Sequence, residues 1–189
     1  MEIRFMKRPN ILFVLCISFL LVACSGNAVL NESLNDQGVP TWVGDGSSIL
    51  KSKDDRLFHG VGSATMLGDF SLQTSIANRR ARREIARIVT SFMEIVSREY
   101  IATGQASHAG FNEQEVAKQI AMLNNMDLSK VEVVGHWSDD GSRIIYAIAQ
   151  MDIEKVRKAI KELASVNKGL KAFISVEGDR IFDRIAKKE

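Results

Sequence analysis

The chain has 189 residues, of which 46% are hydrophobic and 25% are charged, and its formal net charge is +2. These values are typical of a single globular domain that is large enough to bury a core of ordinary size. A charge this small argues against nucleic acid as a partner, because proteins that bind nucleic acid are usually strongly basic.

Residues 1–23 have the pattern of a secretory signal peptide. Lys7 and Arg8 precede an apolar run over 11–22, and a small residue, Ala23, follows the run. The run is shorter than the roughly 20 apolar residues that a membrane-spanning helix needs. We therefore expect the leader to direct export and to be removed.

The leader runs into Leu-Val-Ala-Cys, in which the cysteine is Cys24. This sequence resembles the bacterial lipobox, and the resemblance implies cleavage before Cys24, a diacylglycerol thioether on its sulfur and a third acyl chain on its amino group. Two or more acyl chains, such as palmitate, anchor a protein stably. The next residue is Ser25, where lipoproteins of the inner membrane commonly have aspartate, so the resemblance points to the outer membrane, on its periplasmic or surface face. The alternative is an ordinary secretory leader with an incidental cysteine.

Processing changes the charge and the cysteine content. The leader carries three basic residues and one acidic residue of the chain's 25 and 23, so the mature chain has 22 of each. Cys16 is lost with the leader and Cys24 carries lipid, which leaves no cysteine for a disulfide or a metal site. We expect no metal and no cofactor, and the stability of the fold must come from packing.

Residues 24–53 are predicted to be a flexible tether and residues 54–189 a single domain. The tether is rich in Asn, Ser, Gly and Asp, and its apolar residues show no period. Trp42, which follows Pro40-Thr41, is the exception. An indole is costly to leave in water, so we expect it to dock on the domain.

The first predicted strand, 57–65, contains two glycines, Gly60 and Gly62. Glycine inside a strand commonly marks the close approach of another backbone. A phosphate-binding loop is the alternative, but the strand lacks the third glycine of a dinucleotide fingerprint and the Gly-Lys-Ser/Thr of a P-loop. We therefore predict that a helix packs closely on this strand.

A long helix is predicted from Asp69 or Ser71 to about Ala102. Apolar residues recur every three or four positions along it and form a core stripe of Ala77, Ala81, Ile85, Ile88, Phe92 and Val96. Its early turns also carry five arginines, Arg79, Arg80, Arg82, Arg83 and Arg87.

These arginines have two interpretations. They form a patch for acidic lipid headgroups or for a partner's carboxylates, with Arg79, Arg80 and Arg83 as the candidate contacts. Alternatively they lie on a solvated face, with one or two of them over the sheet. The second interpretation is favoured, because arginine stems commonly cover apolar surface.

The rest of the chain predicts a helix, a hairpin and two further helices. Asn112 and Glu115 form a capping box for a helix that reaches about residue 125. Alternating segments at 131–137 and 144–148 flank a strong turn signal at 138–142 and predict a hairpin. Amphipathic helices follow, one capped by Asp152 and a last one after Gly169, which Gly178 weakens at its middle.

This order of elements predicts an α+β fold. A small antiparallel sheet of about three strands would have the long helix and the further helices packed on one face, giving a two-layer sandwich.

Several segments together resemble the Lpp-twenty lipoprotein family. They are Pro40-x-Trp42, the strand Phe-His-Gly-Val-Gly-Ser-Ala from Phe58, the Ala/Arg-rich stretch 77–88 and the hairpin's Tyr-Ala-Ile-Ala from Tyr146. The similarity covers roughly residues 39–160 and leaves out the last helix. That family includes the FlgP group of flagellar outer-membrane lipoproteins and is related to the amino-terminal domain of FlgT. The resemblance implies an α/β domain at the outer membrane and, in flagellar members, a part in motility or in structures around the motor.

No group of residues has a catalytic pattern. The chain has three histidines, His59, His108 and His136. Their spacing in the sequence is not that of a metal site. His59 and His136 are candidates to meet across paired strands, but histidines in strands are more often half-buried structural groups, and this second interpretation is favoured. Asp139 and Asp140 are explained by a turn, and Ser63 lacks the flanks of a nucleophile elbow. We therefore expect a protein that is not an enzyme.

Two functions of different class are therefore considered. The first is a structural or adaptor lipoprotein of the cell envelope, which assembles with itself or with envelope or flagellar proteins. The second is a periplasm-facing module that binds a small ligand or peptidoglycan between its helices and its sheet. A cavity lined by convergent polar groups favours the second function, and a flat apolar or arginine-rimmed surface favours the first.

Overall fold

The structure is a computed structural model. It describes residues 33–51, 56–65, 68–104, 131–162 and 166–186, together with positions 114, 115, 118 and 121. The predicted leader, the predicted lipidation site Cys24 and almost all of the helix predicted over 112–125 lie outside the described residues.

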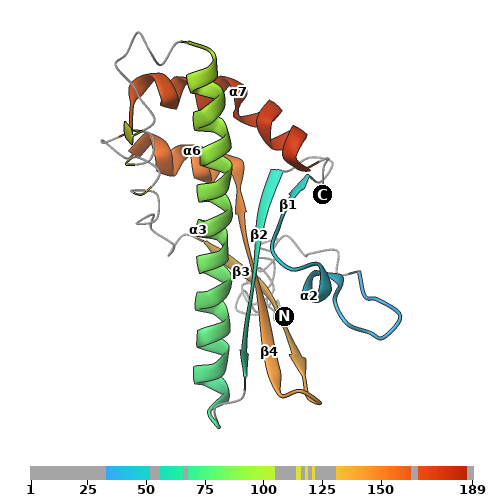
Figure 1. Cartoon of the computed structure of the whole chain (residues 1–189). Helices are drawn as coiled ribbons and strands as arrows, with labels where there is room; N and C mark the ends of the chain where they lie inside the picture. Colours follow the sequence, from blue (N-terminus) through green and yellow to red (C-terminus); the bar gives the residue numbers. More distant parts are fainter. Residues whose placement is uncertain are drawn as a thin grey trace, which may run out of the picture.

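An antiparallel sheet of four strands forms one layer of the domain (Figure 1). The strand order is β1-β2-β4-β3. The strands are β1 (Ser48–Lys51), β2 (Arg56–Thr65), β3 (Glu132–Asp139) and β4 (Ile144–Asp152). The predicted α+β sandwich is confirmed. The sheet has the three expected strands and one more, β1, which pairs with β2.

The added strand corrects the extent of the predicted tether. Residues 48–51 were assigned to the tether, but they form β1 because backbone pairing with β2 holds them. Just before β1, Ser47 Oγ accepts a hydrogen bond of 2.9 Å from the Val61 N–H. Helix α2 (Thr41–Asp45) precedes it and carries Trp42, which is only 8% exposed, so the indole is buried as predicted.

Helix α3 (Phe70–Ala102) forms the second layer and runs along the sheet (Figure 1). It begins where predicted, because the Asp69 side chain accepts a hydrogen bond of 3.0 Å from the Leu72 N–H. All six residues of the predicted core stripe are buried. The helix ends at Ala102, Thr103 caps it, and Gly104 follows with a φ of 74°.

Gly60 and Gly62 of β2 lie directly against α3. A Cβ atom built on Gly62 would be 2.3 Å from the Ala81 backbone nitrogen and 2.5 Å from the Ala77 carbonyl oxygen. A Cβ atom on Gly60 would be 2.4 Å from the Ala81 carbonyl oxygen. Only hydrogen fits at either position, so the predicted close packing of a helix on this strand is confirmed.

The predicted hairpin joins β3 and β4. Asp139 holds its turn, because its carboxylate accepts hydrogen bonds from the backbone N–H groups of Gly141, at 3.0 Å, and Ser142, at 3.2 Å. Hydrogen bonds from the Ser142 side chain and backbone, and then from Gly141, lower the pKa of Asp139. A register shift between Val133 and Gly135 marks an irregularity in β3.

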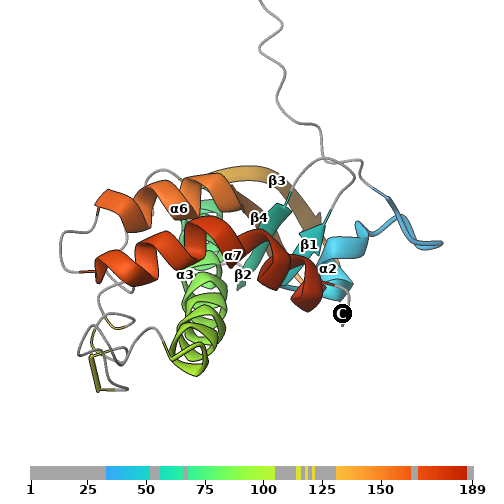
Figure 2. The same ribbon diagram turned by 90° about the horizontal axis from the view of Figure 1, so that it is seen from above.

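Helices α6 (Ile153–Glu162) and α7 (Lys168–Ala186) lie side by side across one end of α3 (Figure 2). Asp152 caps α6 as predicted and accepts a hydrogen bond of 2.7 Å from the Lys155 N–H. Phe182 of α7 enters the main core, where its ring centroid is 5.1 Å from that of Phe58 of β2. Phe92 of α3 completes this aromatic cluster, 5.5 Å from Phe58.

Ion pairs also connect α7 to the rest of the domain. Arg157 of α6 is 8% exposed and pairs with Asp179 of α7 at 2.5 Å. Its guanidinium lies against Gly178, where a Cβ atom would be 3.2 Å from Arg157 Nη2. The glycine that interrupts the helical pattern of α7 therefore makes room for a buried charge. Arg56 of β2 pairs with Asp183 at 2.7 Å, and this hydrogen bond raises the pKa of Arg56.

Candidate functional site

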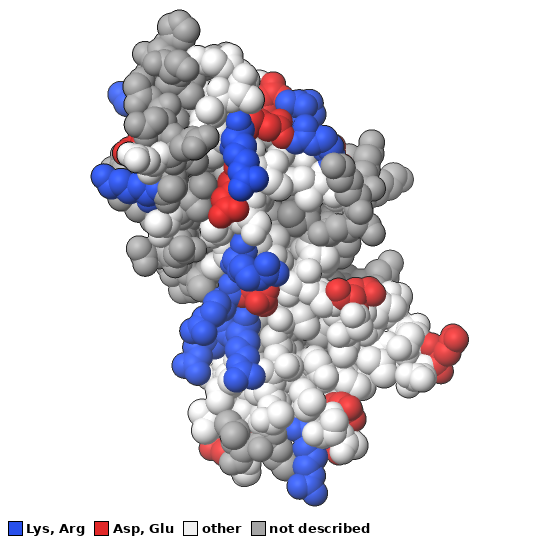
Figure 3. All heavy atoms as spheres, in the orientation of Figure 1, with Lys and Arg blue, Asp and Glu red and all other residues white. Residues whose placement is uncertain are grey.

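The first half of α3 carries four exposed arginines, which we call the arginine face and define as Arg79, Arg80, Arg83 and Arg87. In Figure 3 a group of basic side chains covers the lower middle of α3. Over residues 70–88 the sequence has five arginines and one acidic residue, Glu84. The surface therefore carries a local positive excess on a mature chain that is predicted to be neutral.

The arginines of this region differ in what they contact. Arg87 pairs with Glu84 at 2.7 Å, and Arg80 donates a hydrogen bond of 2.6 Å to the Ser63 carbonyl of β2. Arg79 and Arg83 are exposed and show no ion pair or hydrogen bond to any residue that the structure describes. Of the three candidate contacts, Arg79 and Arg83 are thus available to a partner, whereas Arg80 already binds the sheet.

Another side of α3, which carries Asn78 and Arg82, faces β3. Arg82 donates a hydrogen bond of 3.0 Å to the Val131 carbonyl just before β3. One turn earlier, Asn78 Oδ1 and His136 Nε2 of β3 lie 2.6 Å apart. Arg80 and Arg82 are therefore the arginines that lie over the sheet, one on each side of the helix. This agrees with the expectation that one or two of them would do so.

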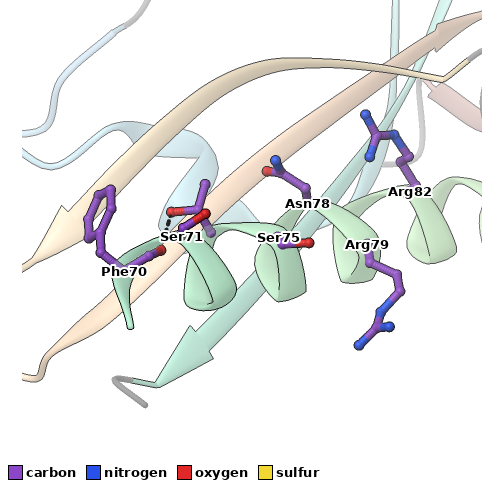
Figure 4. A pocket seen from close by; sticks show the side chains of 7 residues that line it. Phe70, Ser71, Ser75, Asn78, Arg79 and Arg82 are labelled. Atoms are coloured by element: carbon purple, nitrogen blue, oxygen red, sulfur yellow. Dashed lines mark hydrogen bonds between the residues drawn. The ribbon is translucent and has the colours of Figure 1, made fainter. Parts of the chain in front are cut away.

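A groove of about 900 Å³ runs along α3 beside these contacts. We call it the α3–β3 groove because it lies on the flank of α3 that bonds β3. Its described lining comes from α3 alone and consists of Phe70, Ser71, Thr74, Ser75, Asn78, Arg79 and Arg82. In Figure 4 Asn78 and Arg82 point to one side of α3, the side on which they bond β3, and Arg79 points to the opposite side. Phe70, at the start of the helix, is 69% exposed.

The groove was not predicted from the sequence. A usable signal was present, because Ser71, Thr74, Ser75 and Asn78 recur at helical spacing and form a polar stripe between the core stripe and the arginines. A polar helical stripe is ordinarily solvated, so the pattern alone does not show that a strand edge lies beside it.

The histidines do not form a site together. His59 lies on β2 and His136 on β3, and β4 separates these strands in the sheet. The alternative in which the two meet across paired strands is therefore excluded. His59 is 6% exposed, and its Nε2 lies 2.9 Å from Gln150 Nε2 of β4, so it is a buried structural group. His108 lies outside the described residues.

His59 predicts a pH-dependent stability. Burial lowers the pKa of His59 below its ordinary value of 6.5. The unfolded chain therefore takes up a proton near pH 6.5 that the folded chain does not, and the free energy of unfolding should fall as the pH is lowered through this value. We expect His59→Gln to reduce that fall, measured by urea denaturation at about pH 7.5 and about pH 5. An identical pH dependence in wild type and variant would contradict the assignment.

Within the described part of the chain, no three His, Cys, Asp or Glu residues are placed to hold a metal ion together. No described helix combines the length and the apolar character that crossing a membrane requires. A scan against models of known protein families matches none of them, and a search of curated proteins also finds no match.

Proposed function

We propose that the protein is an outer-membrane-anchored lipoprotein that acts as a non-catalytic structural or adaptor component of the cell envelope. The observation that carries the proposal is the lipobox-like Leu-Val-Ala-Cys ending at Cys24, behind a leader of the expected design. The resemblance to the Lpp-twenty family supports the same compartment and suggests an association with the flagellum and motility.

The packing of the domain supports an adaptor over a ligand carrier. Between β2 and α3 the backbones are in contact at Gly60 and Gly62, and the surrounding core side chains are almost fully buried. That region leaves no room for a ligand between helix and sheet. The α3–β3 groove is instead open along its length and rimmed by Arg79, which is the kind of surface that proteins present to other proteins.

The alternative is a periplasm-facing module that binds a small ligand or peptidoglycan. Only the polar lining of the α3–β3 groove favours it, since hydroxyl and amide groups can bind a sugar or a peptide. The openness of the groove makes it a poor enclosure for a small molecule.

The anchor is tested by Cys24→Ser. This variant should incorporate no palmitate and should accumulate as a precursor or as a form that is not attached to the membrane. The wild type should carry palmitate and fractionate with the outer membrane. The matched control is Cys16→Ser, which changes the other cysteine and should leave labelling intact. Labelled wild-type protein in the inner membrane would refute the destination, and unlabelled wild type would refute the anchor.

A further inference from the structure

The side of α3 that faces away from the sheet combines basic and apolar side chains. Arg79 and Arg83 are exposed and lie one helical turn apart on this side. Leu72, which is 50% exposed, and the half-buried Ile76 continue the same side toward the start of the helix. Successive residues of an α-helix are rotated by about 100°, so these four residues share one face, opposite Ala81 of the core stripe. We call this face the outward side of α3.

The charge of the outward side is not compensated within the described part of the chain. Between residues 70 and 93 the helix has a single acidic residue, Glu84, and it pairs with Arg87. Arg79 and Arg83 have no ion pair or hydrogen bond with any described residue. The described elements that contact α3 are the strands of the sheet and α7, and none of them covers the outward side (Figure 1, Figure 3). Two exposed guanidinium groups therefore attract an anionic complement.

The proposed anchor would hold this surface close to a bilayer. The described part of the chain begins at Ser33, whose Oγ lies 2.9 Å from Thr41 Oγ1 of α2, the helix that carries the buried Trp42. Ser33 is nine residues after Cys24, and nine residues span at most about 32 Å when fully extended. A helix and a sheet are each about 10 Å thick, so this length suffices to reach a bilayer that touches the outer side of the helix layer. Headgroups would thus be present at a high effective concentration.

We propose that the outward side of α3 rests on the membrane that holds the anchor, with Arg79 and Arg83 bound to the phosphate groups of anionic phospholipids. Guanidinium groups bind phosphate through two parallel hydrogen bonds, and their apolar stems can lie beside Leu72 at the membrane surface. A membrane is favoured over an acidic protein because the anchor supplies it at short range and because apolar residues accompany the arginines, as on other interfacial helices. The inference rests on the proposed function and adds that the domain has a fixed orientation on the bilayer.

A fluorescent label on the outward side tests the contact. With Cys16 removed and Cys24 acylated, Ala86→Cys supplies the single thiol of the mature chain, three residues after Arg83. The acylated protein with bimane at this position is reconstituted into vesicles that carry nitroxide on a fraction of the headgroups. Nitroxide should quench the label in vesicles that contain phosphatidylglycerol, and much less in vesicles of phosphatidylcholine alone. High salt should reduce this difference, because it screens exposed charges.

Charge variants show whether the arginines cause the contact. Arg79→Glu with Arg83→Glu should lower the equilibrium constant for the contact by about tenfold or more and remove the quenching, because each basic residue contributes to binding an anionic surface. The matched control, Lys158→Glu with Lys168→Glu, makes the same change of charge on exposed residues of α6 and α7 and should leave the quenching unchanged. Arg79→Gln with Arg83→Gln replaces the pair if the reversed variant fails to fold.

Equal quenching in the two kinds of vesicle, no quenching in either, or unchanged quenching in the arginine variants would overturn the proposal. So would a label that is insensitive to phosphatidylglycerol while the arginine variants lose assembly or motility, which would assign the face to an acidic partner protein. Failure of the anchor is seen separately, as wild type without palmitate. In that case Ala86→Cys is labelled in a Cys24→Ser background and mixed with the same vesicles at higher lipid concentration. The same dependence on phosphatidylglycerol is then expected, and its absence would overturn the proposal.

Discussion

Replacing Gly62 with valine should lower the free energy of unfolding by about 3 kcal/mol, which is the upper end of the range for overpacked cores. Even the first added carbon would lie 2.3 Å from the Ala81 backbone nitrogen and 2.5 Å from the Ala77 carbonyl oxygen. These are backbone atoms of a long helix, which cannot rotate aside as a flexible side chain can. The helix must move as a body, and its contacts with β2 and β4 would be loosened.

Urea denaturation of Gly62→Val, Gly62→Ala and Gly44→Ala measures this effect. Gly62→Ala should also destabilise, though less than valine, because it adds only the Cβ atom. Gly44 of α2 has nothing within 4 Å of its Cβ position, so alanine there should be neutral or slightly stabilising. If Gly62 instead served a phosphate site, its substitution would abolish binding and leave the melting temperature unchanged, which would refute close packing as the reason for the glycine.

Much of the fold could be predicted because local sequence signals determine where its elements begin, turn and pack. Local signals set the helix start at Asp69, the hairpin turn at Asp139 and the core stripe of α3, and all three are found in the structure. Gly60 and Gly62 also predicted a long-range contact, because glycine inside a strand commonly marks the close approach of another backbone. By contrast, β1 has four residues, and only its pairing with β2 distinguishes it from a tether.

The site was partly predictable for a geometrical reason. Successive helical residues are rotated by about 100°, so the positions of Arg79 and Arg83 are fixed relative to the core stripe of Ala77 and Ala81 and face away from it. Arg80 and Arg82 fall on opposite flanks of that stripe. Which strand each flank meets depends on the strand order, and this order arises from pairing across the chain. The sequence could therefore identify the arginines but not the edge strand beside Arg82.

The second large effect is expected at Phe182. This residue is fully buried in α7, and its ring packs edge-on against those of Phe58 and Phe92. Phe182→Ala should lower the free energy of unfolding by about 3–5 kcal/mol, because it removes a large buried side chain and leaves a cavity among rigid neighbours. The segments from which a resemblance to the Lpp-twenty family is proposed end before α7, so this variant also tests whether α7 is an integral part of the domain.

Urea unfolding followed by both fluorescence and far-ultraviolet circular dichroism shows whether α7 unfolds together with the rest of the domain or separately from it. If α7 belongs to the core, Phe182→Ala should shift both signals together to lower urea and keep a single transition. Val176→Ala is the matched control, because Val176 lies on the same helix and is 76% exposed, so its loss should change the stability by less than about 0.5 kcal/mol. Two separate transitions, or an effect of Phe182→Ala no larger than that of Val176→Ala, would show that α7 folds apart from the sheet and α3. The ion pairs that join Arg56 and Arg157 to Asp183 and Asp179 argue for the single transition, since they connect α7 to both β2 and α6.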